Sequence, residues 1–203
     1  MTKLYSFAAA GVLAVMLLGT FAFIQFSGSS HAANSCEAPQ VAGATIGGPF
    51  ELVNTESETV TDADVIDRPS LVYFGYTFCP DACPYDVARN VDAVEMLKEA
   101  GHDVRPVFIS IDPERDTPEV MSEYQGYMHP DLVGLTGSPE QVKSAADAYR
   151  VYYNRGPSED DEFYLVDHTT FTYLMLPGSE IATFFRREAT AEAIADMTAC
   201  LIS

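Results

Sequence analysis

The sequence predicts an α/β fold in which a central mixed β-sheet is flanked by helices. Between residues 71 and 150, apolar runs of strand length alternate with segments of helical periodicity. After residue 160 the order changes to strands joined by a turn, followed by a final helix. A length of 203 residues suits one domain with appendages better than two domains.

The first half of this domain is expected to contain a hairpin and two strand–helix units. Residues 50–53 and 58–60 suggest a short hairpin, and the uniformly apolar residues 71–76 suggest a strand buried on both faces. A helix follows from Pro84, which suits a first helical position, and Gly101 stops it. Its apolar residues recur at helical spacing, at Val87, Val91, Val94 and Leu97.

The second half continues the alternation and then departs from it. Capping residues and prolines mark two helix starts, at Thr117-Pro118 and Ser138-Pro139. Further strands are expected at 104–111, 132–135, 163–166, 171–175 and 181–185, and further helices at 118–128, 138–150 and 190–201. Pro177-Gly178 turns the chain between the last two strands. This order predicts a thioredoxin-like fold with an additional N-terminal hairpin.

The N-terminal segment indicates export. Residues 4–26 carry no charge and are long enough to cross a bilayer as a helix of about 20 residues. Residues 1–3, which include Lys3, would then be cytoplasmic. A cleaved signal peptide is the alternative, but the apolar run is longer than such peptides require.

The region after the apolar segment divides into a tether and a folded domain. Residues 27–48, rich in Gly, Ser and Ala, predict a tether, and residues 49–203 the exported domain. The expected location is the bacterial inner membrane, with a single N-terminal anchor and the soluble domain in the periplasm.

The charge balance excludes one class of partner. The chain has 11 basic and 30 acidic residues and a formal net charge of −19 at pH 7. Such a surface repels phosphate backbones, so nucleic-acid binding is excluded. A solvated surface is the favoured interpretation, and attraction to a basic protein partner is the alternative.

Cys79 and Cys83 are the main candidates for chemistry. They lie four residues apart where an apolar strand leads into a helix, so both are expected on one face of the first turn, with Cβ atoms about 5–6 Å apart. They could bind one soft metal ion or form a redox-active disulfide, and the helix N-terminus favours the thiolates that both uses need. A structural disulfide closing so short a loop would contribute little stability.

The other two cysteines and the four histidines have different expected roles. Cys36 and Cys200 lie at the two ends of the exported domain, where a structural disulfide between them would tie down both termini. Among the four histidines, His31 lies in the tether, and His102 and His129 are expected at the surface. His168 follows an apolar strand, at a sheet edge where α/β proteins place their active sites.

Three motifs identify a resemblance to a known family. Residues 73–84 (YFGYTFCPDACP), 110–118 (SIDPERDTP) and 166–170 (VDHTT) followed by YLM resemble the signatures of the Sco/SenC family of copper-handling proteins. The resemblance covers residues 40–201. It implies a thioredoxin-like fold with an inserted hairpin, copper bound by Cys79, Cys83 and His168, and delivery to the binuclear copper site of cytochrome c oxidase subunit II.

The chemistry of these side chains agrees with copper. Thiolates select copper(I) and imidazole accommodates copper(II), so the set suits either state. A structural zinc site would be expected to have four protein ligands, and the sequence offers no fourth strong candidate. Asp167 is a candidate for orienting the histidine. Residues 112–116 are expected to cap and turn the segment before the next helix, and a role in partner docking is the weaker alternative.

Other functions use the same thiols. A thiol–disulfide oxidoreductase could reduce the cysteines of the oxidase copper site, although its usual spacing is Cys-x-x-Cys. Peroxidase chemistry at Thr77 and Cys79 ranks last, and a non-catalytic interaction module leaves the two cysteines and the histidine unexplained. The expected partners are subunit II, an exported thioredoxin-like thiol reductant and another copper chaperone as donor.

Overall fold

The structure, a computed structural model, describes residue 36 and residues 46–158 and 163–203. The expected anchor at residues 4–26 and most of the expected tether lie outside these residues. Within the described part of the chain, no helix is long and apolar enough to cross a membrane. The α/β domain lies within residues 38–203.

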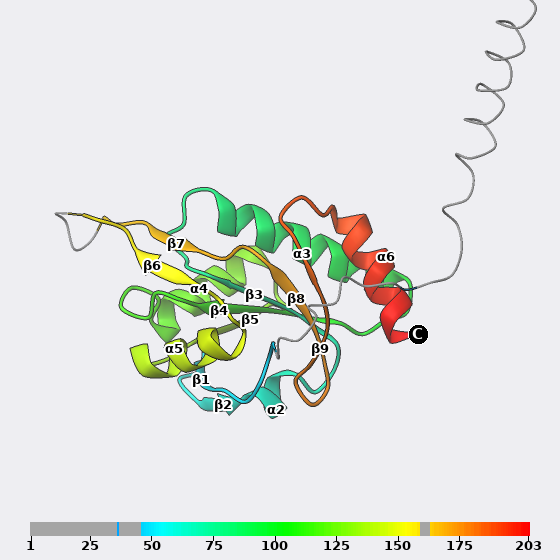
Figure 1. Ribbon diagram of the computed structural model, residues 1–203, viewed down its shortest axis with the longest axis horizontal. Coiled ribbons are helices and arrows are strands. Elements are labelled where there is room, and N and C mark those ends of the chain that lie inside the picture. Colours follow the sequence, from blue (N-terminus) through cyan, green and yellow to red (C-terminus); the bar gives the residue numbers. More distant parts are fainter. Residues whose placement is uncertain (1–35, 37–45, 159–162) are drawn as a thin grey trace, which may run out of the picture. The chain divides into compact units, whose positions relative to one another are not determined.

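A seven-stranded mixed sheet forms the centre of this domain, in the order β2-β1-β5-β4-β3-β8-β9 (Figure 1). Its strands are β1 (Glu51–Asn54), β2 (Thr59–Thr61), β3 (Ser70–Gly75), β4 (Arg105–Ser110), β5 (Val133–Thr136), β8 (Thr172–Leu176) and β9 (Glu180–Phe185). Strands β3, β4 and β5 are parallel, whereas β1 and β8 run antiparallel to their neighbours β5 and β3. The mixed sheet and the N-terminal β1–β2 hairpin are both confirmed.

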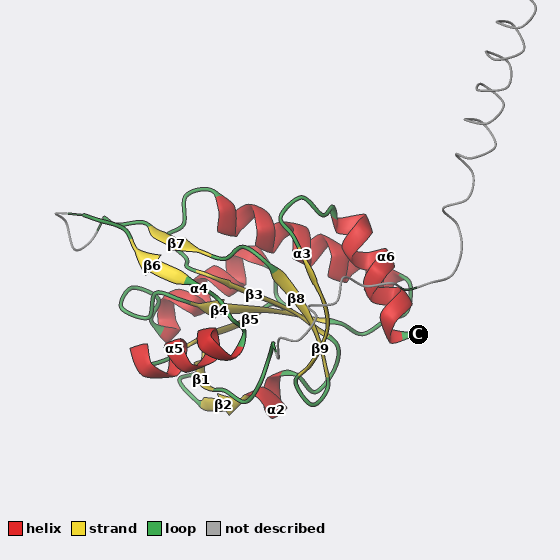
Figure 2. Ribbon diagram, in the orientation of Figure 1, coloured by secondary structure: helices red, strands yellow, loops and turns green. Residues whose placement is uncertain are grey.

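Helices cover both faces of the sheet. They are α2 (Asp62–Val65), α3 (Ala82–Glu99), α4 (Pro118–Met128), α5 (Pro139–Ala148) and α6 (Ala191–Ile202). In Figure 2, α3 and α6 lie on one side of the strands and α5 on the other. The side chains of Thr117 and Ser138 accept hydrogen bonds from the first turns of α4 and α5, which confirms these two helix starts, and Thr190 caps α6 in the same way. The short α2 was not predicted.

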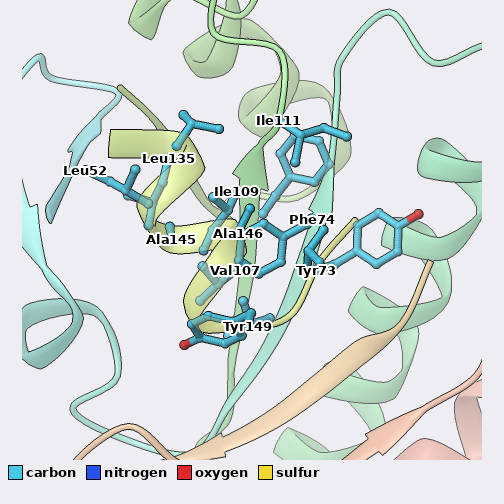
Figure 3. Close-up of a cluster of buried hydrophobic side chains, with 14 of the residues drawn as sticks. Leu52, Tyr73, Phe74, Val107, Ile109, Ile111, Leu135, Ala145, Ala146 and Tyr149 are labelled. Carbon is cyan, nitrogen blue, oxygen red and sulfur yellow. The ribbon is translucent and has the colours of Figure 1, made fainter. Parts of the chain in front are cut away.

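Neighbouring aromatic residues of β3 show how this strand is buried on both faces. Successive side chains of a strand point to opposite faces. The Tyr73 hydroxyl donates to Asp86 of α3 at 3.0 Å, whereas the Phe74 ring packs against Tyr149 with 5.1 Å between the ring centroids. Figure 3 shows Tyr73 directed away from the group that contains Phe74, Ala146 and Tyr149. All six residues of β3 are buried, as the apolar run predicts.

The strand expected at residues 163–166 is wrong in extent, and the observed strand does not belong to the central sheet. Strand β7 covers Val166–His168 and pairs with β6 (Tyr153–Arg155) in a separate two-stranded antiparallel sheet. Phe163 and Leu165 are 77% and 59% exposed, whereas Tyr164 and Val166 are buried, so only alternate residues of the apolar run pack against the core. Strand β6 contains the polar residues Asn154 and Arg155 and carries no apolar signal, so it was missed. His168 therefore ends a strand of this small sheet, not of the central one.

Candidate metal centre

Cys79 lies in the turn between β3 and α3, not on the first turn of the helix as expected. Helix α3 begins at Ala82, two residues before Pro84. The Cys79 Sγ accepts a hydrogen bond from the backbone N–H of Cys83 at 3.3 Å. This N–H is one of the donors that a helix start leaves without an intrahelical partner. The sulfur thus fixes the start of α3 and is itself held beside the second cysteine.

Cys83 occupies a closely packed position under the end of β3. Its side chain is fully buried. A Cβ added at Gly75 would lie 2.9 Å from the Cys83 Sγ and equally close to ring atoms of Phe108 and Tyr73. Real Cβ atoms do not approach this closely, so only glycine leaves room for the sulfur. The sequence places Gly75 in an apolar strand, where nothing local reveals this role.

We expect Gly75→Ala to destabilise the domain by about 1–3 kcal/mol, because the added methyl overpacks a filled site. The same methyl should displace the Cys83 sulfur and weaken metal binding. Thermal unfolding and a copper titration would measure the two effects. Gly126→Ala in α4 is the matched control, since a Cβ there meets nothing within 4 Å. Equal stability and copper binding of the two variants would contradict the prediction.

His168 approaches the cysteines from strand β7. Its Nε2 lies 3.4 Å from the Cys83 Sγ, and its Nδ1 lies 2.9 Å from the Thr169 carbonyl oxygen. A carbonyl only accepts, so Nδ1 carries the proton and Nε2 turns its lone pair toward the sulfur. The rings of Tyr73 and Tyr76 meet the imidazole edge-on, with centroid distances of 6.1 and 6.0 Å.

The structure therefore brings together the three residues that the sequence predicts as ligands. The ligand atoms of Cys79, Cys83 and His168 all lie within 4.8 Å of one another. Asp167, which was expected to orient the histidine, is exposed to solvent. The Thr169 carbonyl takes that place. Cys36 and Cys200 are disulfide-bonded, whereas Cys79 and Cys83 are free thiols.

The two thiols differ in their tendency to ionise. The hydrogen bond from the Cys83 thiol lowers the pKa of Cys79 to about 3 against the opposing effect of burial, and the backbone N–H of Cys83 adds to the lowering. The same contact with Cys79, together with burial, raises the pKa of Cys83. Without metal, the pair therefore holds a Cys79 thiolate beside a Cys83 thiol. The expectation that the helix N-terminus favours both thiolates gives the right direction for Cys79, where the Cys83 thiol is the largest cause, and is wrong for Cys83, where the contact with Cys79 and burial both oppose the charge.

Alkylation should distinguish the two thiols. Cys79 is partly exposed and its thiolate is already formed, so its rate of reaction with iodoacetamide should stay nearly constant between about pH 5 and about pH 8. An ordinary thiol would gain roughly 700-fold in thiolate over that range. Buried Cys83 should react far more slowly. Peptide mass spectrometry of timed samples measures both rates, and a steep rise for Cys79 with pH would contradict the prediction.

Asp116 supports the turn that carries Cys79, a role that the sequence did not reveal. It is fully buried. Its carboxylate accepts hydrogen bonds from the Thr77 backbone N–H at 3.1 Å, the Thr77 hydroxyl at 2.5 Å and the Ser110 hydroxyl at 2.6 Å. The sequence predicts capping and turning, or more weakly partner docking, for residues 112–116. Asp116 instead ties the cysteine turn to the end of β4.

Comparisons with known proteins agree with the predicted resemblance. Residues 38–203 match the family model described as SCO1/SenC. Protein SenC of Rhodobacter capsulatus is 54% identical over 162 residues, which cover 79% of this chain and 72% of SenC.

Two solved structures are also similar. Arabidopsis thaliana ScoI with copper bound has 43% identity and a TM-score of 0.74, with 77% of this chain and 98% of that chain covered. Yeast Sco1 with copper bound has 35% identity and a TM-score of 0.70, with 75% and 86% covered. The predicted thioredoxin-like fold is confirmed by these likenesses.

Proposed function

The chain belongs to the SCO1/SenC family, and from this membership we propose that it is a copper-binding chaperone for the assembly of cytochrome c oxidase. The Sco family is described as one of cytochrome c oxidase assembly proteins, and two solved relatives hold copper. The observation that carries the proposal is the convergence of Cys79, Cys83 and His168 within 4.8 Å.

The donor set suits a metal that must be passed on. Two sulfur ligands and one imidazole nitrogen accommodate copper(I) and copper(II). Three protein ligands leave a position open for an incoming ligand of another protein. Cys79 is partly exposed, so exchange can begin at its sulfur, while buried Cys83 retains the ion. Binding of copper displaces the Cys83 proton.

We further propose that the copper goes to the binuclear copper site of cytochrome c oxidase subunit II, and that another copper chaperone supplies it. The test incubates copper-loaded protein with the reduced, copper-free copper domain of subunit II. Appearance of the binuclear-site absorption spectrum is expected with the native protein and with His102→Ala, and not with His168→Ala. No transfer from the native protein would overturn the proposal.

The thiol–disulfide oxidoreductase remains the second candidate, because Cys79 is present as a thiolate, the form that attacks a disulfide. The test incubates reduced, copper-free protein with the oxidised copper domain of subunit II and measures the free thiols that form on that domain. An oxidoreductase would keep its activity in His168→Ala and lose it in Cys79→Ser. A chaperone would lose copper in Cys79→Ser, Cys83→Ser and His168→Ala alike.

We also propose a location, on the basis of the uncharged residues 4–26. We place the domain in the periplasm, held by an anchor at residues 4–26. Paired thiols oxidise in such a compartment, so an exported thioredoxin-like reductant is a predicted partner. Membrane fractionation of cells, with alkaline extraction and N-terminal sequencing, would test the anchor. A soluble protein that begins after residue 26 would overturn it.

We predict that Cys36 and Cys200 are joined to each other, because both are disulfide-bonded while Cys79 and Cys83 are free thiols. Mass spectrometry of a non-reduced digest should find one peptide pair that joins the two cysteines. A Cys36 that alkylates without prior reduction would contradict this pairing.

A further inference from the structure

The Tyr164 ring lies between two guanidinium groups. The Cζ atom of Arg115 is 3.5 Å from the ring centroid and that of Arg155 is 3.9 Å. At these distances each face of a ring has room for only one such group, so the two cations take opposite faces. Cations over an aromatic face are attracted to it, more strongly when water is excluded. Tyr164 is 6% exposed.

Hydrogen bonds close a ring of contacts around this stack. The Tyr164 hydroxyl donates to Asp112 at 2.6 Å, and the Arg115 Nε donates to the other carboxylate oxygen of Asp112 at 2.5 Å. The Arg115 Nη1 donates to the Tyr164 backbone carbonyl at 3.1 Å. Asp112 is buried, so these charge-assisted bonds are shielded from solvent. Tyr164 is thus held at its ring, its hydroxyl and its backbone.

This arrangement joins the two halves of the metal centre. Tyr164 directly precedes Leu165 and strand β7, whose last residue is His168. The Arg115 guanidinium also lies over Phe78, the neighbour of Cys79, at 4.9 Å, and over Tyr76 at 5.6 Å. Arg115 therefore contacts both the turn that carries Cys79 and the segment that carries His168.

Side-chain contacts must hold β7 against the central sheet, because β7 has no backbone pairing with that sheet. Strand β7 pairs with β6 in a sheet separate from the central one. The backbone N–H of Val166 donates to the Tyr76 hydroxyl at 3.2 Å, and the ring of the same tyrosine meets His168 edge-on. The position of the imidazole therefore depends on how the residues before β7 are fixed to the core.

We propose that Tyr164, clamped between Arg115 and Arg155, is a positioning residue that holds His168 within bonding distance of the metal bound by Cys79 and Cys83. The inference rests on the proposed copper binding and adds the reason that the histidine stays in place. Removal of the outer partners of a metal ligand typically lowers metal affinity about 10- to 100-fold.

The test compares Tyr164→Leu with Tyr164→Phe. Tyr164→Leu removes the aromatic face and should weaken copper binding about 10- to 100-fold, with fewer nitrogen neighbours in X-ray absorption of the loaded protein. Tyr164→Phe keeps the stack and should restore the nitrogen ligand. Tyr152→Leu, at a 65% exposed tyrosine next to β6, is the matched control and should match the native protein. Arg155→Ala, which removes one partner of the stack, provides a milder variant if Tyr164→Leu does not fold.

A measurement without copper separates this inference from the proposed function. In the reduced metal-free protein, nuclear Overhauser effects between the His168 and Tyr76 rings should be present. They should disappear in Tyr164→Leu and weaken in Arg155→Ala. Their persistence in these variants would overturn the positioning role, whether or not the protein delivers copper. If the native protein failed to bind copper and the Overhauser effects still disappeared in Tyr164→Leu, the proposed function alone would be overturned.

Discussion

Protein oxidised at Cys79 and Cys83 is expected to lose its copper binding. A disulfide removes both thiolates and leaves the imidazole of His168 as the one remaining member of the set, and thiolates are the ligands that hold copper(I). The two sulfur atoms already lie within 4.8 Å of each other, so a small movement of the Cys79 turn closes the bond. The loss of copper affinity should exceed the roughly 100-fold reduction that follows removal of a residue that supports a metal ligand.

The measurement is metal content after equilibrium dialysis of oxidised and reduced protein against buffered copper. Re-reduction of the oxidised sample should restore one copper per chain, which serves as the control for damage. Mass spectrometry confirms that Cys79 and Cys83 are the pair that changed. Stoichiometric copper in the oxidised protein, with unchanged affinity, would remove the need for a thiol reductant as partner.

Replacing Asp116 by alanine should have the largest effect on stability. The carboxylate accepts three hydrogen bonds, two from Thr77 and one from Ser110, and its removal leaves these buried or half-buried donors without their acceptor. Breaking such a network costs about 3–5 kcal/mol. The Cys79 turn should loosen with it, because Thr77 is two residues away. Urea unfolding measures the free energy, and copper titration in the folded range measures the site.

Two further variants show whether the loss of stability is specific to the Asp116 carboxylate. Asp116→Asn keeps one acceptor oxygen and should lose less stability than Asp116→Ala. Asp92→Ala, at an exposed position of α3, should change the free energy of unfolding by less than about 0.5 kcal/mol. An Asp116→Ala protein as stable as Asp92→Ala would show that the turn is held by other interactions.

The elements that were predicted correctly have local signals. The start of α4 depends on Thr117, Pro118 and a backbone N–H three residues after the cap, all close together in the sequence. Strand β3 is a continuous apolar run, since it is covered by helices on both faces. Strand β6 was missed because its stability comes from pairing with β7, which lies beyond a polar loop, and its own residues are mostly polar and exposed.

The sequence by itself determined which side chains meet at the site. Soft sulfur and imidazole donors at Cys79, Cys83 and His168, within motifs of fixed order, define the chemistry, and chemistry is a property of residue type. The tertiary structure alone decided which thiol is ionised and which imidazole nitrogen faces the Cys83 sulfur. It also decided that Asp116 and Tyr164 support the site. These properties depend on burial and on contacts between residues tens of positions apart, and such contacts leave no pattern along the chain.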